Sequence, residues 1–501
     1  MLGALISDAA RRWGDAVAYV AQTGWSLTYA ALDRLSDEVA AGLTERGIQQ
    51  GDVVAIVLPN VPEYVVGYAA AAKLGAVTAG VNPRLTPVER AALLDLADPS
   101  VIVATSGLAP DRPQVVVIEP ATQDEECLRN LRVPGGSPPP LADDPDRPVA
   151  VVFTSGTTGL PKGAVYGGRQ LDAILRVDTG WRWGGGAPAL AATTFAHLGP
   201  MTKLPGVLMR GGTLYLLERW RAADAIELIA RHRMPGFGGI PTQVALMLAD
   251  PSLADSDLSC LQAIVMGGGP ATPTLIRQAR EVFGATVAVR YSCTEAGVGT
   301  ATAPTDPAGD AEVSVGRPWP GVELFVLDPE DRPVTAGEVG AVCLRSDATM
   351  SGYWRAPELT AAAFTADGAV RTGDLGWVDD VARLRLVGRA KEMYVRGGEN
   401  VYPMEVEDVL AGHPAVAQVV VVPRADDVWG EVGVAVIVPR GPSTPAPTLA
   451  ELREHAAPML ASFKLPEAVV VADALPLTPM DKVDRAALAA LLRDGDGIGG
   501  A

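Results

Sequence analysis

TSGTTGLPKG, at residues 154–163, is the stretch that most constrains the fold of this chain. It follows an apolar run, Val149–Phe153, that predicts a buried strand. Gly156 and Gly159 let backbone N–H groups approach a ligand, and Lys162 adds a positive charge. Four hydroxyl donors complete the loop: Thr154, Ser155, Thr157 and Thr158. Such a loop can hold phosphate oxygens. The simpler alternative is a Ser/Thr/Gly surface loop. It is not the GxxxxGK[ST] loop, because no Ser or Thr follows the lysine.

Charge and cysteine content exclude several classes of protein. The 501 residues carry a net charge of −18, which argues against nucleic acid or an anionic membrane surface as a partner. The four cysteines form no CxxC pair, so the sequence indicates neither a zinc site nor a disulfide framework. The first residues lack the basic start and long apolar run of a signal peptide. We therefore expect a reduced, cytoplasmic protein.

One apolar segment, Tyr64–Val81, is barely long enough to cross a membrane, and Lys73 interrupts it. We predict that it forms a buried helix followed by a short strand, without stable membrane insertion.

Strands and helices alternate along most of the chain. Residues 28–47 predict an amphipathic helix, and Val53–Leu58, Val101–Thr105 and Val115–Ile118 predict strands. The alternation favours an α/β fold with parallel sheets flanked by helices. Further helices are expected at Ala222–His232, Pro273–Phe283, Met404–Leu410, Leu449–Leu460 and Arg485–Leu492, and further strands at Val322–Leu327, Val339–Leu344, Val416–Val422 and Gly433–Val438.

The composition changes near Gly388. We therefore expect two domains, residues 1–388 and 389–501. The first should carry a β-rich subdomain, and the second should be a small, mobile α+β unit.

Further blocks follow the Gly-rich loop in a fixed order: GGGP at 267–270, YSCTE at 291–295, GYW at 352–354, RTGDLG at 371–376, GRAKEMYVRGGENVYPMEVE at 388–407 and PLTPMDKVDR at 476–485. With TSGTTGLPKG, these blocks resemble the signature motifs of the adenylate-forming superfamily, the acyl-CoA synthetases among them. The resemblance covers nearly the whole chain. It implies that a carboxylate reacts with ATP and Mg²⁺ to give an acyl-adenylate, from which a thiol, normally that of coenzyme A, displaces AMP.

The resemblance implies a role for each block. The 154–163 loop would hold the β- and γ-phosphates, Glu295 would bind Mg²⁺, and Thr294 would bond the α-phosphate. Tyr291 would lie against the adenine, with Ser292 beside it where the family commonly has glycine. Four residues would form the other wall of the adenine site: Gly267, Gly268, Gly269 and Pro270.

The later blocks would supply the ribose contacts and the moving parts. Asp374 and Arg389 would bind the ribose hydroxyls, and Lys391 matches the hinge of the small domain. Gly397 and Gly398 would leave room for the pantetheine arm of coenzyme A. His197, in FAHLGP, matches the residue that gates the acyl pocket, although a buried structural histidine is the alternative.

Lys482 matches the lysine that bridges the carboxylate and the α-phosphate during adenylation. The residues before it depart from the family pattern of a small hydroxyl residue and glycine, because this chain has Met480 and Asp481. We expect Asp481 to compete for the Lys482 ammonium and to restrict the loop backbone.

The acid-binding pocket should be formed by His197, Gly239, Ile240, Gly267, Gly297 and Val298. No acidic residue occurs between Leu190 and Pro205, so an amino acid substrate is disfavoured. We expect a bulky, neutral, hydrophobic carboxylic acid. Three alternatives stay open beside the complete synthetase: an enzyme that only transfers preformed acyl-AMP to coenzyme A, one that loads a carrier protein, and an idle adenylate-binding paralogue. The sequence also leaves a homodimer open.

Overall fold

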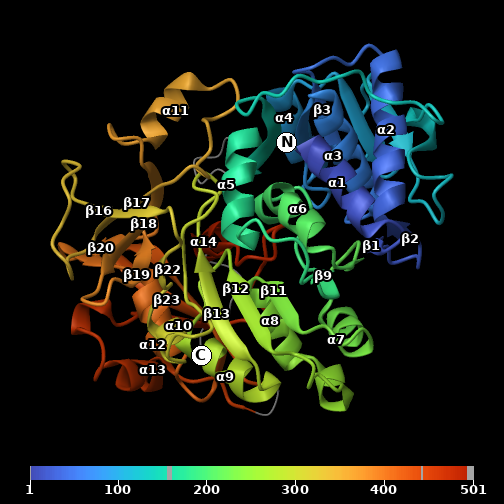
Figure 1. The fold of residues 1–501 in the computed structure, drawn as a ribbon. Coiled ribbons are helices and arrows are strands. Elements are labelled where there is room, and N and C mark those ends of the chain that lie inside the picture. Colours follow the sequence, from blue (N-terminus) through green and yellow to red (C-terminus); the bar gives the residue numbers. More distant parts are fainter. Residues whose placement is uncertain (1, 155–160, 442–443, 494–501) are drawn as a thin grey trace.

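The computed structural model describes residues 2–154, 161–441 and 444–493 (Figure 1). The described residues form five sheets, and helices cover most of them. The predicted α/β class is confirmed.

The largest sheet carries the Gly-rich loop. Its six strands have the order β6-β5-β3-β4-β7-β8, and all neighbours are parallel except the last pair. They are β3 (Val53–Val57), β4 (Val77–Gly80), β5 (Val101–Thr105), β6 (Val115–Ile118), β7 (Pro148–Thr154) and β8 (Lys162–Gly167). The strands β3 and β4 are buried along their whole length, as strands covered on both faces must be.

Three further sheets complete the part of the chain before residue 390. One has the order β2-β1-β10-β9, formed by β1 (Val17–Val20), β2 (Ser26–Thr28), β9 (Ala189–Ala191) and β10 (Leu214–Leu216). The next runs in chain order through β11 (Gly236–Gly239), β12 (Ala263–Gly267), β13 (Thr286–Tyr291), β14 (Thr300–Ala301) and β15 (Arg317–Pro318). The last is an antiparallel meander of β16 (Glu323–Leu327), β17 (Gly340–Arg345), β18 (Val370–Val378) and β19 (Leu384–Arg389). This meander is the predicted β-rich subdomain.

The helices before residue 390 are α1 (Leu2–Trp13), α2 (Tyr29–Glu45), α3 (Pro62–Leu74), α4 (Pro87–Ala97), α5 (Gly168–Thr179), α6 (Leu198–Arg210), α7 (Ala222–Arg231), α8 (Pro241–Ala249), α9 (Pro273–Phe283), α10 (Asp310–Val313) and α11 (Pro357–Ala363). Their ends follow capping chemistry. Thr28 accepts a hydrogen bond from the N–H of Ala31 at the start of α2. Thr86 and Glu89 form a capping box at α4.

The segment Tyr64–Val81 forms most of α3 and then β4, so the predicted buried helix and strand are confirmed. The Lys73 ammonium is buried and pairs with Asp33 and Asp37 at 2.6 Å each. Within the described ranges, no helix is both long and apolar enough to cross a membrane.

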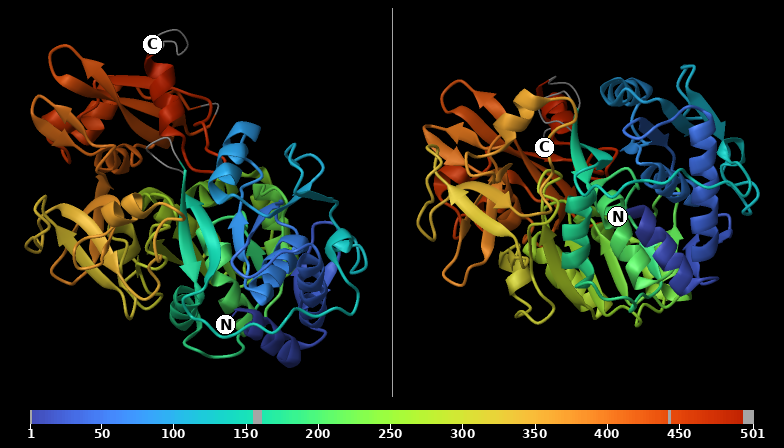
Figure 2. Two further views of the ribbon diagram at one scale, coloured as in Figure 1. Left: turned by 90° about the horizontal axis from the view of Figure 1, so that it is seen from above. Right: turned by 45° about the horizontal axis from the view of Figure 1, so that its top comes forward.

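The chain after residue 393 forms a small α+β unit. Its sheet contains β20 (Tyr394–Arg396), β21 (Glu399–Val401), β22 (Val416–Asp426), β23 (Gly430–Pro439) and β24 (Ala468–Val471), and its helices are α12 (Pro403–Leu410), α13 (Leu449–Ala456) and α14 (Arg485–Arg493). Figure 2 (left) shows this unit seated over one end of the larger part of the chain. The helix α13 ends four residues earlier than expected, because Pro458 has no backbone N–H to continue the helical hydrogen bonds.

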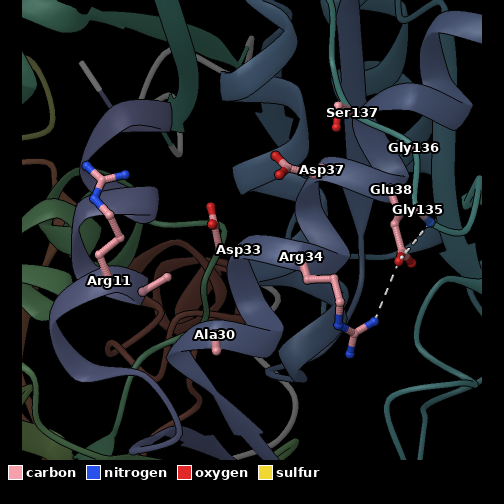
Figure 3. Close-up of a pocket in the computed structure, with 10 residues that line it drawn as sticks. Arg11, Ala30, Asp33, Arg34, Asp37, Glu38, Gly135, Gly136 and Ser137 are labelled. Carbon is pink, nitrogen blue, oxygen red and sulfur yellow. Dashed lines mark hydrogen bonds and ion pairs between the residues drawn. The ribbon is translucent and has the colours of Figure 1, made fainter.

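A hollow lies against α1, α2 and residues 135–137 (Figure 3). Its carboxylates already have partners, since Asp33 and Asp37 bind Lys73 and Glu38 binds Arg132 at 2.7 Å. The hollow shares no residue with the predicted nucleotide or acyl site, and we assign it no function.

Candidate active site

The ends of the Gly-rich loop lie side by side. Thr154 ends β7, Lys162 begins β8, and the two residues are paired across the strands. Ser155, Gly156, Thr157, Thr158 and Gly159 lie outside the described residues. The Lys162 ammonium lies 5.1 Å from the centre of the Tyr353 ring, a cation–π distance. The antiparallel β7–β8 pair therefore places the lysine beside the GYW block.

Glu295 is the second residue that Tyr353 contacts. The Tyr353 hydroxyl donates to Glu295 Oε1 at 2.7 Å, and the Met350 N–H donates to the Glu295 carbonyl at 2.9 Å. This leaves Oε2 of the carboxylate for a cation. In the described part of the chain, no group of three or more His, Cys, Asp or Glu residues could hold a metal ion. One carboxylate fits Mg²⁺ that takes its other ligands from nucleotide phosphates and water.

The GGGP wall follows β12. Gly268 has φ +78°, which L side chains rarely adopt. A Cβ on Gly267 would lie 2.9 Å from the Arg290 carbonyl oxygen on the neighbouring strand. Gly269 has only Pro241 near it, at 3.6 Å from an added Cβ, and Pro270 is exposed. The glycines thus keep this edge of the sheet flat and open, as a planar ring requires.

The YSCTE block begins at the end of β13, next to that wall. The Thr294 carbonyl accepts a hydrogen bond from the buried Tyr166 hydroxyl, which fixes the turn. The Ser292 hydroxyl donates to the Cys293 carbonyl at 3.2 Å, so it makes a local bond.

Asp374 is buried and held from two sides. The Tyr291 hydroxyl donates to Asp374 Oδ2 at 2.7 Å, and Arg389 Nε lies 3.3 Å from Oδ1. The sheet explains this contact, because Asp374 on β18 and Arg389 on β19 are directly paired. Burial raises the pKa of Asp374, and the Arg389 charge opposes that rise. A buried carboxylate beside a cation suits the two hydroxyls of a ribose.

Lys482 belongs to the small C-terminal unit, and its ammonium lies close enough to Asp374 and Arg389 for their charges to act on it. Burial lowers the pKa of Lys482, the Arg389 charge adds to the effect, and Asp374 opposes it. The Lys482 charge also acts on His197, whose pKa is lowered to about 4 by burial first and then by Lys482 and Arg84. His197 is the N-cap of α6, and its Nε2 lies 3.2 Å from the Asn82 side-chain amide. It is therefore neutral at neutral pH.

The structure contradicts the expected competition between Asp481 and Lys482. The Asp481 carboxylate pairs with Arg84, in the loop after β4, at 2.6 Å. The expected backbone restriction is present, since Asp481 has φ +57°. Asp tolerates this left-handed conformation better than most residues, but less well than Gly.

The predicted acyl-pocket residues differ in how much room they leave. A Cβ on Gly239 would lie 2.7 Å from Gln243 Oε1, and one on Gly297 would lie 2.4 Å from the Ala348 carbonyl. Ile240 is buried and Val298 is partly buried. Gly238 is exposed and has no atom within 4 Å of an added Cβ, so the open space lies there.

The residues predicted for the hinge and for coenzyme A lie in turns. Lys391 is exposed, between the end of β19 at Arg389 and the start of β20 at Tyr394. Gly397 and Gly398 form the two-residue turn between β20 and β21, with φ +58° and +90°. A turn of this kind needs positive φ at both positions.

Sequence reasoning missed three residues of the site: Tyr353, Asn82 and Arg84. Tyr353 had a signal, because it lies in the GYW block. Asn82 and Arg84 had none, since only the fold brings their loop to His197 and Asp481.

Comparisons with known proteins agree with this geometry. Residues 6–354 match the model of the AMP-binding enzyme family, and residues 405–482 match that of the AMP-binding enzyme C-terminal domain. The fatty acid–[acyl-carrier-protein] ligase ScoC of Streptomyces coeruleorubidus is 33% identical, over 92% of this chain and 91% of that protein. The medium/long-chain-fatty-acid–CoA ligase FadD8 of Mycobacterium tuberculosis is 33% identical, over 83% of this chain and 73% of that protein. ATP-bound MatB from Rhodopseudomonas palustris superimposes with a TM-score of 0.86, at 26% identity and 99% coverage of both chains.

The chain belongs to the AMP-binding enzyme family, within the adenylate-forming superfamily. Its class is that of the ATP-dependent acyl-CoA ligases.

Proposed function

We propose that this enzyme activates a carboxylic acid with a bulky apolar body as the acyl-adenylate and passes the acyl group to coenzyme A. The observation that carries the proposal is the meeting of Lys482 with His197, Asp374 and Arg389. These residues lie far apart in the sequence. An enzyme that joins an acid to a nucleotide needs a cation between the mouth of an acyl pocket and a ribose site.

The first half-reaction forms a bond between the substrate carboxylate and the α-phosphorus, and pyrophosphate leaves. Lys482 would stabilise the charge that develops on the α-phosphate, since a fixed cation in a water-poor site needs no reorganisation. Asp374 and Arg389 would hold the ribose and so align the phosphate chain. Glu295, with Thr154 and Lys162 at the ends of the Gly-rich loop, would hold Mg²⁺ and the outer phosphates. Bound Mg²⁺ would neutralise phosphate charge.

The second half-reaction joins a thiolate to the acyl carbon and releases AMP. We propose that the segment around Lys391 is the hinge between residues 1–388 and 389–501, and that the Gly397–Gly398 turn admits the pantetheine arm. Two observations support this: the sheets divide at residues 390–393, and the turn carries no side chains.

The acyl acceptor has a second candidate, the pantetheine arm of a carrier protein. The similarity to a fatty acid–[acyl-carrier-protein] ligase favours it. The test is a panel of hydrophobic acids with ATP, Mg²⁺ and either coenzyme A or a phosphopantetheinylated carrier protein. Mass spectrometry should detect acyl-AMP and acyl-CoA. If only amino acids stimulated AMP release, the proposed substrate class would be wrong.

A further inference from the structure

One face of α6 differs from the rest of the helix. Gly199, Lys203, Gly206 and Arg210 recur at spacings of four, three and four residues, so they share a face. The other side is apolar and packs in the main core; its buried residues include Met201, Leu204 and Leu208. A Cβ on Gly199 would meet no atom within 4 Å. The N-terminal end of this face, at Gly199, therefore borders open space, two residues after His197.

The sheet β11–β15 supplies the opposite wall. Alternate residues of its strands, among them Phe237, Ile264, Met266, Val287 and Val289, pack in a core on one side. The intervening positions, Gly238, Val265 and Arg290, face the other way. Gly238 on β11 and Arg290 on β13 are exposed, although both lie within strands of a five-stranded sheet. The charges of Asp178 on α5 and Arg210 on α6 act on Arg290, which places these helices across from the sheet.

The space between α6 and the sheet has an excess of positive charge. Lys203 makes no hydrogen bond or ion pair with any residue that the structure describes. Among the same residues the Arg290 guanidinium has no carboxylate partner, and it lies 5.6 Å from the centre of the Trp319 ring. Within the described residues, Asp178 is the carboxylate whose charge acts on Lys203, and it already binds Arg210 at 2.7 Å. Three cations thus share one anion, which leaves an excess charge of about +2 between α6 and the sheet.

Partly buried cations without partners are costly, and stable sites supply an anion for them. Burial lowers the pKa of Lys203, and the Arg290 charge lowers it further, as expected of an ammonium that lacks a counter-ion. Asp178 cannot serve, because its carboxylate is fixed beside Gly206, where a Cβ would lie 2.1 Å from Oδ2. A carboxylate of the ligand would supply the missing anion.

We propose that the acid this enzyme activates carries a second carboxylate, bound by Lys203 and Arg290 between α6 and the sheet β11–β15. The proposal rests on the synthetase function above, and it replaces the expected neutral acid with one that is apolar in its middle and anionic at both ends. Lys203 follows His197 by six residues, about 9 Å along the helix axis. This depth matches on the order of seven carbon–carbon bonds between the two carboxyl carbons.

The test compares octanedioic acid with octanoic acid, and dodecanedioic acid with dodecanoic acid, as substrates for coenzyme A ligation with ATP and Mg²⁺. The wild-type enzyme should have a kcat/KM at least tenfold higher for the diacid that fits the space between α6 and the sheet. Lys203→Met should lower kcat/KM for that diacid tenfold to hundredfold. It should leave the monoacid unchanged or improve it, because an unpaired cation is removed. Lys203→Arg should restore part of the diacid activity.

Two further variants separate binding from folding. Arg290→Gln, on the sheet opposite Lys203, should lose the preference for the diacid as Lys203→Met does. Arg176→Met, on the exposed side of α5, should leave kcat/KM unchanged for both the monoacid and the diacid. Equal use of monoacid and diacid by the wild type, or an equal loss for both in Lys203→Met and Arg290→Gln, would overturn the second carboxylate and leave the synthetase standing. Failure of every acid to yield acyl-AMP or acyl-CoA would instead overturn the proposed function itself.

Discussion

The Arg84–Asp481 ion pair should favour adenylation over thioester formation. Arg84 belongs to the loop after β4, and Asp481 belongs to the loop that carries Lys482, so the pair ties the small unit to the large one at 2.6 Å. The small unit must leave this arrangement if it turns before the thiol attacks. Breaking the pair therefore removes stability from the adenylating arrangement alone.

The geometry sets the size of the effect. The two side chains are 38% and 19% exposed, so the pair is partly screened and contributes about 0.5–1 kcal/mol, a factor of about two to five. Arg84→Gln and Asp481→Asn should each slow acyl-AMP formation by that factor. The double variant should lose no more than either single one. Asp481→Gly also relieves the positive φ, so its two effects oppose each other and its net change should be small.

The assay measures the two half-reactions separately. ATP–pyrophosphate exchange with the acid reports adenylation, and conversion of synthetic acyl-AMP with coenzyme A reports the transfer. Raised salt should mimic the variants in the first assay only. Faster adenylation in Asp481→Asn would refute the reasoning and restore competition between Asp481 and Lys482. Equal slowing of both half-reactions by Arg84→Gln would show that the pair is not specific to one arrangement.

Three further outcomes test other parts of the structure. Asp374→Ala should weaken AMP binding by about 2–3 kcal/mol in both half-reactions, measured by calorimetry, since charge-assisted bonds to the ribose are lost; unchanged affinity would remove the assignment. Lys482→Ala should lower ATP-dependent adenylation at least hundredfold and spare the conversion of synthetic acyl-AMP, whereas equal losses would contradict its role. Burial raises the pKa of Asp408 to about 7; stability should therefore fall as the pH rises from about 4 to 7, and Asp408→Asn should remove up to about 4 kcal/mol of that loss, measured as unfolding at pH 4 and pH 8.

The sequence predicted the elements well where a single periodicity governs them. The helix over residues 28–47 and the strands of the largest sheet lie where expected, because their apolar spacing and caps are local features. The predicted end of α13 was wrong, since Pro458 ends the helix although the apolar pattern continues beyond it. Most predicted residues of the nucleotide site lie in the sequence blocks that follow the Gly-rich loop. The fold brings Glu295, Asp374, Arg389 and Lys482 near one another.

Contacts between distant segments could not be predicted in the same way. From the sequence, Asp481 is expected to compete for the Lys482 ammonium, because the sequence shows only which residues are neighbours along the chain. The positive φ of Asp481 instead accompanies a carboxylate bound to Arg84, almost four hundred residues away in the sequence.

The proposed site of the second carboxylate could not be predicted from the sequence for the same reason. A search of residues 190–205 for an acid that would pair with an amino acid substrate correctly finds none, yet that stretch contains Lys203. A lone lysine in a helix is ordinarily a solvated residue. It becomes informative only when Arg290 is placed across the same space and Asp178 is already bound to Arg210. The proposed specificity for a diacid therefore depends on a charge balance between α5, α6 and β13, three elements that no local pattern connects.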